Sequence, residues 1–247
     1  SGIQSWDLEK TINVYSQIPV GFINVDIANV YANMEGMIKT IKTYRSAFPN
    51  ARIIAGNICS SEPVKDLVDA GANIIKIGVG PGAACKTRSE VGVGVPQFSA
   101  VQDVVESAKL FGVMTIADGG CVNSGDICKA IGAGADIVMI AGMVSHSEEC
   151  DNVIEVDGKK YINFYGLGSN AQYKKFTPQE VEYRPNEGRD LLIPVKGSML
   201  DVINQIKGAL RSVCTYVGTN NISKLHDHVE FAEVNNTINK SLEKYER

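Results

Sequence analysis

The chain has 247 residues, of which 44% are hydrophobic and 21% charged, an ordinary globular balance that excludes a disordered chain. Lys and Arg number 24 against 28 Asp and Glu, so the net charge is −4 and no nucleic-acid partner is expected. No apolar run approaches the ~20 residues that span a bilayer, so no membrane partner is expected either. The length allows one large domain or two small ones.

Strand-like and helix-like segments alternate along the first two thirds of the chain. Short runs rich in Ile and Val, typical of buried parallel strands, occur at residues 22–27, 52–55, 73–79, 113–117 and 136–140. Residues with helical spacing separate them, at 34–44, 64–68, 101–108 and 127–131. This alternation predicts an α/β fold with a parallel sheet.

Two of these units echo each other. Residues 70–77 read AGANIIKI and residues 133–140 read AGADIVMI. We interpret both as the end of a helix entering a strand. A modular βα barrel produces such echoes, although two short matches are weak evidence of a repeat.

The pattern changes after Gly142. Residues 143–197 show no clear βα unit, and we interpret them as a flap excursion within one catalytic domain spanning residues 1–247. A helical pattern resumes at residues 199–210. The charged tail from Ser223 onward is expected to be peripheral.

Glycines gather where the predicted strands end. They are Gly56, Gly78, Gly80, Gly82, Gly119, Gly120 and Gly142. In parallel α/β folds the ligand site lies at these strand ends, and glycines there let the backbone approach a ligand and bind phosphate. The alternative is that they only form tight turns.

The cysteines are Cys59, Cys85, Cys121, Cys128, Cys150 and Cys214. None belongs to a CxxC pair, so we predict reduced thiols and a cytoplasmic protein. No targeting segment is recognised, and the opening Ser1-Gly2 resembles a cut end. Cys85 differs from the others because it follows the glycine-rich turn and has Lys86 and Arg88 beside it. Nearby cations favour the thiolate, so Cys85 is a candidate nucleophile, although a lone cysteine is usually a small buried hydrophobe.

Three motifs resemble the IMP dehydrogenase and GMP reductase family. They are IGVGPGAACKTR at residues 77–88, GVGVPQ at 92–97 and ADGG at 117–120. The resemblance implies a (β/α)8 TIM barrel, usually in a homotetramer. Five strands cannot close a barrel, so we expect the N-terminal strands to be missing from this chain, as in a fragment or a separate segment.

Residues 157–161, 182–184 and 214–218 are similar to the GMP reductase branch of that family. The resemblance implies conversion of GMP to IMP and ammonia with oxidation of NADPH. Cys85 would attack purine C2 and form a thioimidate, and Thr87 would assist proton transfer. The alternatives left open are an IMP dehydrogenase-like activity and a catalytically impaired purine-nucleotide-binding regulatory protein.

The resemblance also implies residue roles. Substrate-binding positions would be Asp118, Gly119, Gly120, Ala141, Gly142, Leu167, Gly168, Ser169 and Asn170. Cofactor-binding positions would be Asp26, Ile27, Ala28, Asn29, Asn57, Val79, Gly80, Lys196 and Gly197. A potassium ion would lie at Gly80, Gly82, Cys85 and Arg88, held largely by backbone carbonyls.

Two residues depart from the family pattern as we interpret it. Asn170 stands at the catalytic position where the resemblance implies a Glu that helps to deliver a proton, and Asn cannot act as an acid. Glu149 and Glu180 are possible substitutes for that acid. Ala83 replaces a Ser that would contact the nucleotide phosphate.

Overall fold

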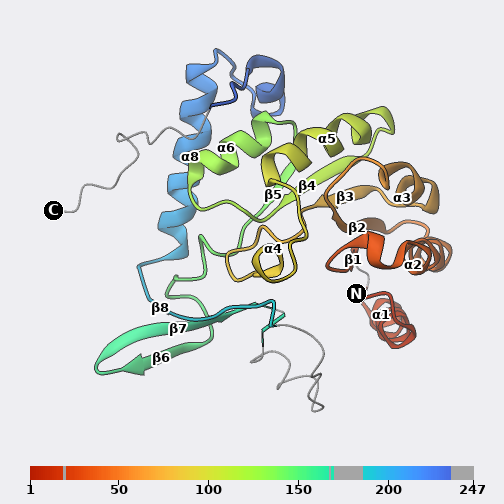
Figure 1. Ribbon diagram of the computed structural model, residues 1–247, viewed down its shortest axis with the longest axis horizontal. Helices are drawn as coiled ribbons and strands as arrows, with labels where there is room; N and C mark the ends of the chain where they lie inside the picture. Colours follow the sequence, from red (N-terminus) through yellow and green to blue (C-terminus); the bar gives the residue numbers. More distant parts are fainter. Residues whose placement is uncertain (19–20, 167, 170–185, 235–247) are drawn as a thin grey trace.

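A single parallel sheet organises the first two thirds of the molecule (Figure 1). The computed structural model describes residues 1–18, 21–166, 168–169 and 186–234. The parallel strands are β1 (Phe22–Asp26), β2 (Arg52–Ile58), β3 (Ile74–Ile77), β4 (Met114–Asp118) and β5 (Ile137–Met139). They pair in chain order, β1-β2-β3-β4-β5. The predicted α/β fold and its five strands are therefore confirmed.

Helices cover one face of this sheet and bury its core. They are α2 (Met34–Ala47), α3 (Val64–Ala70), α5 (Gln97–Leu110) and α6 (Ser124–Gly132), as Figure 1 shows. In α2 the spacing of Met37, Ile41 and Tyr44 puts all three on one helical face, and all three are fully buried. Asn33 caps this helix by accepting a hydrogen bond from the Gly36 amide at 2.9 Å. The similarity between residues 70–77 and residues 133–140 is also explained. In both segments a helix, α3 or α6, ends a few residues before a strand, β3 or β5, begins.

The other face of the sheet is partly open. Phe22, Met114, Ile137 and Met139 are 58%, 44%, 41% and 45% exposed, respectively. In a closed barrel, inward side chains of this kind fill the interior in layers. The described strands therefore form a segment of a barrel whose inner surface is partly exposed to solvent at these apolar side chains.

The segment after β5 forms an antiparallel sheet instead of another βα unit. Its strands are β6 (Val153–Val156), β7 (Lys159–Tyr165) and β8 (Asp190–Pro194), in that order. The strands β6 and β7 are joined by a tight turn in which Asp157 has a φ of 50°. The helix α8 (Met199–Tyr216) follows and packs beside α6 (Figure 1).

The prediction that the tail is peripheral from Ser223 onward is wrong for its first residues. The 3-10 helix η2 (Ile222–His228) buries Leu225 completely. A ring nitrogen of His226 lies 2.9 Å from the Gly132 carbonyl oxygen, and the Phe231 ring contacts Phe98 edge to face. Apolar residues spaced among the charges anchor this part of the tail against α5 and α6.

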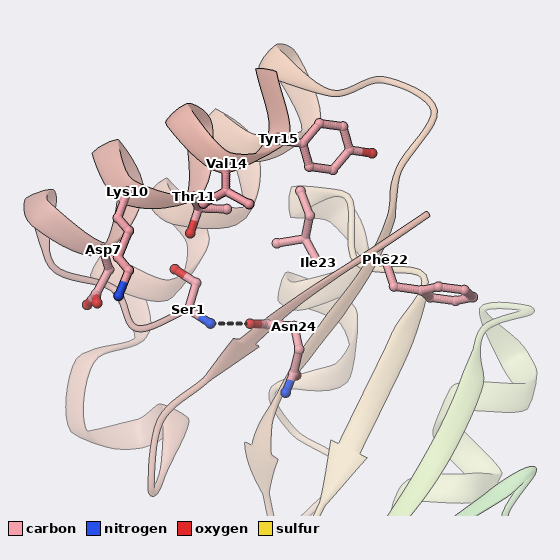
Figure 2. A pocket seen from close by; sticks show the side chains of 9 residues that line it. All are labelled: Ser1, Asp7, Lys10, Thr11, Val14, Tyr15, Phe22, Ile23 and Asn24. Atoms are coloured by element: carbon pink, nitrogen blue, oxygen red, sulfur yellow. Dashed lines mark hydrogen bonds between the residues drawn. The ribbon is translucent and has the colours of Figure 1, made fainter. Parts of the chain in front are cut away.

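An N-terminal helix that the sequence pattern did not reveal lies beside the sheet edge. It is α1 (Ser5–Gln17), and Figure 2 shows the side chains that line a pocket between it and β1. The volume of this pocket is about 350 Å³. The lining residues are Ser1, Asp7, Lys10, Thr11, Val14, Tyr15, Phe22, Ile23 and Asn24. None of them belongs to the predicted site. Among the described helices, none is both long and apolar enough to cross a membrane.

Candidate active site

Four polar side chains meet at the carboxyl end of the parallel sheet. Lys76, on β3, places its ammonium nitrogen 2.8 Å from Oδ2 of Asp26 and 2.6 Å from Oδ2 of Asp118. Asn57 donates to the same Asp118 oxygen at 3.0 Å and to the Gly78 carbonyl at 2.6 Å. Parallel strands bring their carboxyl ends to one edge, so residues far apart in sequence converge there.

The backbone of β2 makes room for this lysine. Gly56 pairs with Lys76 in the sheet, and a Cβ atom on Gly56 would lie 2.6 Å from the Lys76 carbonyl oxygen. That separation is too short for any side chain. The glycine that follows the second predicted strand is therefore needed for close packing beside the cluster, in addition to any role toward a ligand.

The cysteine loop rests on a row of glycines from the neighbouring strand ends. A Cβ atom on Gly119 would lie 3.2 Å from Pro81, and one on Gly142 would lie 2.9 Å from the Ala83 Cβ. The Gly119 and Gly120 φ angles are 87° and 82°, which favour glycine over other residues. The Gly119 amide donates to the Met139 carbonyl at 3.1 Å. Of these two amides, the Gly120 amide has no hydrogen-bond partner among the described residues, so it is the one that can bind a phosphate.

Cys85 begins a chain of three hydrogen-bonded side chains. Its sulfur lies 3.2 Å from Thr87 Oγ1, and the Thr87 hydroxyl donates to Glu187 Oε2 at 2.6 Å. A thiol, a hydroxyl and a carboxylate in series form a path along which a proton can move. Glu187 was not among the sequence-predicted acids.

Backbone contacts hold Glu187 in this position. Cys85 and Gly188 form an isolated antiparallel bridge. On either side of it, the Lys86 amide donates to the Glu187 carbonyl at 2.6 Å and the Arg189 amide donates to the Ala84 carbonyl at 2.8 Å. The segment leading into β8 is therefore joined to the cysteine loop as a short strand pair, which aims Glu187 at Thr87.

Arg88, one of the two cations beside Cys85 in the sequence, contacts backbone carbonyls of two neighbouring segments. The Arg88 guanidinium donates to the carbonyls of Val79 and Val95, at 3.1 and 2.5 Å. It therefore braces the turn between β3 and α4 (Thr87–Glu90). This bracing role joins the glycine-rich turn to the GVGVPQ segment, and the effect of the Arg88 charge on the thiol stays a prediction.

The remaining predicted site residues have contacts of their own, mostly through the backbone. The Ile27 amide donates to the Gly56 carbonyl at 2.9 Å, the Ile27 carbonyl accepts from the Asn57 amide at 2.9 Å, and Ala28 follows directly in the chain. Asn29 caps the 3-10 helix η1 (Val30–Asn33) by accepting from the Tyr31 amide. Lys196 and Gly197 bond through their backbones to residues 146 and 148. Ser169 is fully buried, and Gly168 lies beside Glu187, whereas Leu167, Asn170, Glu180 and residues 182–184 lie outside the described residues.

The suggestion that Glu149 supplies the missing acid is wrong. Its carboxylate accepts from the Ser198 hydroxyl at 2.7 Å and from the Met199 amide at 2.9 Å. These hydrogen bonds at the start of α8 lower the pKa of Glu149. Glu149 is thus a helix-capping acid, and Glu187 occupies the place beside Thr87.

The thiols outside the cysteine loop are less suited to nucleophilic chemistry. Burial raises the pKa of Cys59 and of Cys128, and burial together with the nearby Asp126 raises the pKa of Cys121 to about 11. Cys150 donates weakly to backbone carbonyls of its own turn. These cysteines are free and partly buried, which agrees with the prediction of reduced thiols.

One residue at the strand ends, Asn57, has a side-chain oxygen that suits a nicotinamide cofactor. Asn57 is 9% exposed, and its Oδ1 atom has no hydrogen-bond partner among the described residues. A buried unpaired amide oxygen suits a donor such as a carboxamide NH2 group. No cluster of three or more His, Cys, Asp or Glu side chains that could bind a metal occurs in the described part of the chain. Any cation at the cysteine loop would depend on backbone oxygens.

Comparison with known proteins identifies the family. The model of the IMP dehydrogenase / GMP reductase domain matches residues 2–242. The chain belongs to this family. Curated relatives include GMP reductase of Ascaris suum, 39% identical over all of this chain and 69% of the relative, and human GMP reductase 2, 42% identical over 97% of this chain and 69% of the relative.

A solved relative matches the three-dimensional structure. It is the C318A variant of Trypanosoma brucei GMP reductase in complex with guanosine 5′-monophosphate, with a TM-score of 0.87 and 34% sequence identity. The match covers 95% of this chain but 49% of that chain. The chain thus spans about two thirds of the length of the curated relatives and about half of the solved one.

Proposed function

We propose that the protein acts as a GMP reductase that converts GMP to IMP and ammonia with NADPH as reductant. The observation that carries this proposal is the Cys85–Thr87–Glu187 series at the mouth of a barrel segment. Relatives named GMP reductase, about 40% identical over nearly the whole chain, support it. So does a solved neighbour that binds GMP.

The first half of the reaction uses the side-chain series as a proton path. Glu187 takes the Cys85 proton through the Thr87 hydroxyl, and the thiolate attacks C2 of GMP. The same path returns one proton to the 2-amino group, which leaves as ammonia while the C2–N bond breaks. One hydrogen passes in total from the thiol to the leaving amine, and a thioimidate joins Cys85 to C2.

The second half restores the thiol. Bound NADPH supplies a hydride to C2, and the C2–S bond breaks to give IMP. Glu187, which is a carboxylate once ammonia has left, takes a proton from solvent and passes it through Thr87 to the Cys85 thiolate that is released. Asn57 Oδ1 and the half-exposed Asp26 carboxylate are the groups we expect on the nicotinamide side.

The substrate site follows from the glycines and Asp118. Asp118 is 19% exposed and can accept hydrogen bonds from ribose hydroxyls. The Gly120 amide and the loop near Ala83 suit the phosphate. With Ala83 in place of a hydroxyl, the phosphate would lose one hydrogen bond, which we expect to cost about 1–3 kcal/mol of affinity.

We also infer a potassium ion at the carbonyls of the cysteine loop, near Gly80, Gly82 and Cys85, because carbonyl oxygens are the ligands this ion prefers. The Gly82 carbonyl already accepts from the Cys85 amide at 2.9 Å, so it would use its second lone pair. A homotetramer and a cytoplasmic location complete the proposal. The family resemblance supports the tetramer, and six unpaired cysteines support the location.

The test is NADPH oxidation by the purified protein with GMP, followed at 340 nm, together with an ammonia assay. We expect equal amounts of NADP⁺, IMP and ammonia, and no turnover by Cys85→Ser. NAD⁺ reduction with IMP instead would favour a dehydrogenase. GMP binding without either reaction would favour a regulatory protein.

A further inference from the structure

Lys76, a buried lysine on β3, belongs to the site but was not predicted from the sequence. Lys76 stands among isoleucines in β3, yet its side chain is 3% exposed and contacts two carboxylates. An unpaired ammonium in such a place would be very unfavourable, so the pairing is obligatory. The question is what the arrangement does for a ligand.

Hydrogen bonds converge on one oxygen of Asp118. Lys76 at 2.6 Å and Asn57 at 3.0 Å both contact Oδ2. Among the described residues, no donor contacts Oδ1. Two donors on one oxygen fix the rotation of the carboxylate and leave the other oxygen for a ligand hydroxyl.

We propose that Lys76 is a positioning residue that orients Asp118 so that Oδ1 accepts a hydrogen bond from a ribose hydroxyl of the bound nucleotide. The inference rests on the proposed function and names how the ribose is recognised. The Lys76 ammonium also forms an ion pair with Asp26, and it therefore links the Asp118 carboxylate to the end of β1. Among the described residues, the hydrogen bonds and ion pairs of the Lys76 ammonium go to Asp26 and Asp118 and not to Cys85.

The test compares GMP with 2′,3′-dideoxy-GMP in calorimetric titrations without cofactor. In the wild type, removal of the ribose hydroxyls should weaken binding at least tenfold. In Lys76→Met this ratio should fall to less than threefold, because the carboxylate is no longer held toward the ribose. Lys65→Met is the matched control, since Lys65 pairs with Asp69 on an exposed face of α3, and its ratio should equal that of the wild type.

A purely structural lysine would give a different result. Both nucleotides would then weaken equally in Lys76→Met, the ratio would stay at the wild-type value, and the proposal would be overturned. Should Lys76→Met fail to fold, Lys76→Arg takes its place, because the charge is kept while the donor geometry changes. We expect a reduced ratio in that variant, and an unchanged ratio overturns the proposal.

The two proposals can fail separately. A wild-type protein that binds neither nucleotide contradicts the proposed function. A wild-type protein that binds both equally well still permits catalysis but overturns the ribose contact of Asp118, and the role of Lys76 with it.

Discussion

Thr87 donates a hydrogen bond to Glu187 at 2.6 Å although the two residues are 100 positions apart in the chain. The bridge between Cys85 and Gly188 creates this proximity by joining the cysteine loop to the segment that enters β8. The flap excursion therefore contributes an acid to the site. The chemistry proposed for the protein depends on this acid.

Replacement of that acid gives the first prediction. Glu187→Gln keeps a hydrogen-bond partner for Thr87 but cannot exchange a proton, so kcat should fall by ~10²–10⁴. The KM for GMP should stay within about threefold, since the lost interaction serves the transition state. Steady-state kinetics measure both values. Glu90→Gln, on the same short helix as Thr87 and exposed, should leave kcat unchanged.

The Thr87 hydroxyl, which lies between Cys85 and Glu187, should act in the same proton path as Glu187. Thr87→Val should reduce kcat about as much as Glu187→Gln, and the double variant should be hardly slower than either single one, because a broken path cannot be broken again. Thr87→Ser, which restores the hydroxyl, should recover most of the rate. Multiplicative losses in the double variant would show that the two residues act independently.

Local sequence patterns predicted the parallel strands and the cysteine loop, because alternating βα units and glycines at strand ends are short-range features. They did not predict Glu187, which lies 100 positions from Thr87 and is held there by the bridge between Cys85 and Gly188. Nor did they predict Lys76, a charged residue within an apolar strand. Glu149 was considered instead because the sequence shows that it is an acid but does not show that it contacts Ser198 at the start of α8. The tail from Ser223 onward was predicted to be peripheral because its charges obscured the buried Leu225.

Thiol chemistry should separate Cys85 from Cys121. The raised pKa of Cys121, about 11, keeps this thiol protonated at neutral pH. Iodoacetamide at pH 7.5 should therefore alkylate Cys85 first, as followed by peptide mass mapping, and GMP should slow that alkylation. Faster modification of Cys121 would contradict the assignment of the reactive thiol.

Packing at Gly56 should limit what this position tolerates. A Cβ atom there would overlap the Lys76 backbone, so Gly56→Ala should destabilise the fold by ~1–3 kcal/mol in urea unfolding. Gly21→Ala is the matched control, because nothing lies within 4 Å of its added Cβ, and it should change stability by less than ~0.5 kcal/mol. Equal effects would mean that Gly56 is not needed for close packing.

Glu149 should make stability depend on pH in a defined direction. Its pKa is lowered in the folded state, so its carboxylate stabilises the fold above the unfolded-state pKa of about 4.3. This contribution is lost as the pH falls through the lower folded-state pKa. Glu149→Gln should therefore lower Tm at pH 7, with the difference from wild type shrinking in acid. Glu148→Gln, at the neighbouring exposed position, is the control and should leave Tm at pH 7 unchanged.

The central claim is that the sulfur of Cys85 bonds to C2 of GMP after ammonia leaves. The most direct measurement is mass spectrometry of protein quenched after incubation with GMP alone, with peptide mapping and an ammonia assay. We predict a purine-nucleotide adduct on the Cys85 peptide and an equal amount of ammonia, both absent in Cys85→Ser. Turnover that persists in Cys85→Ser, or an adduct confined to another cysteine, would contradict the account.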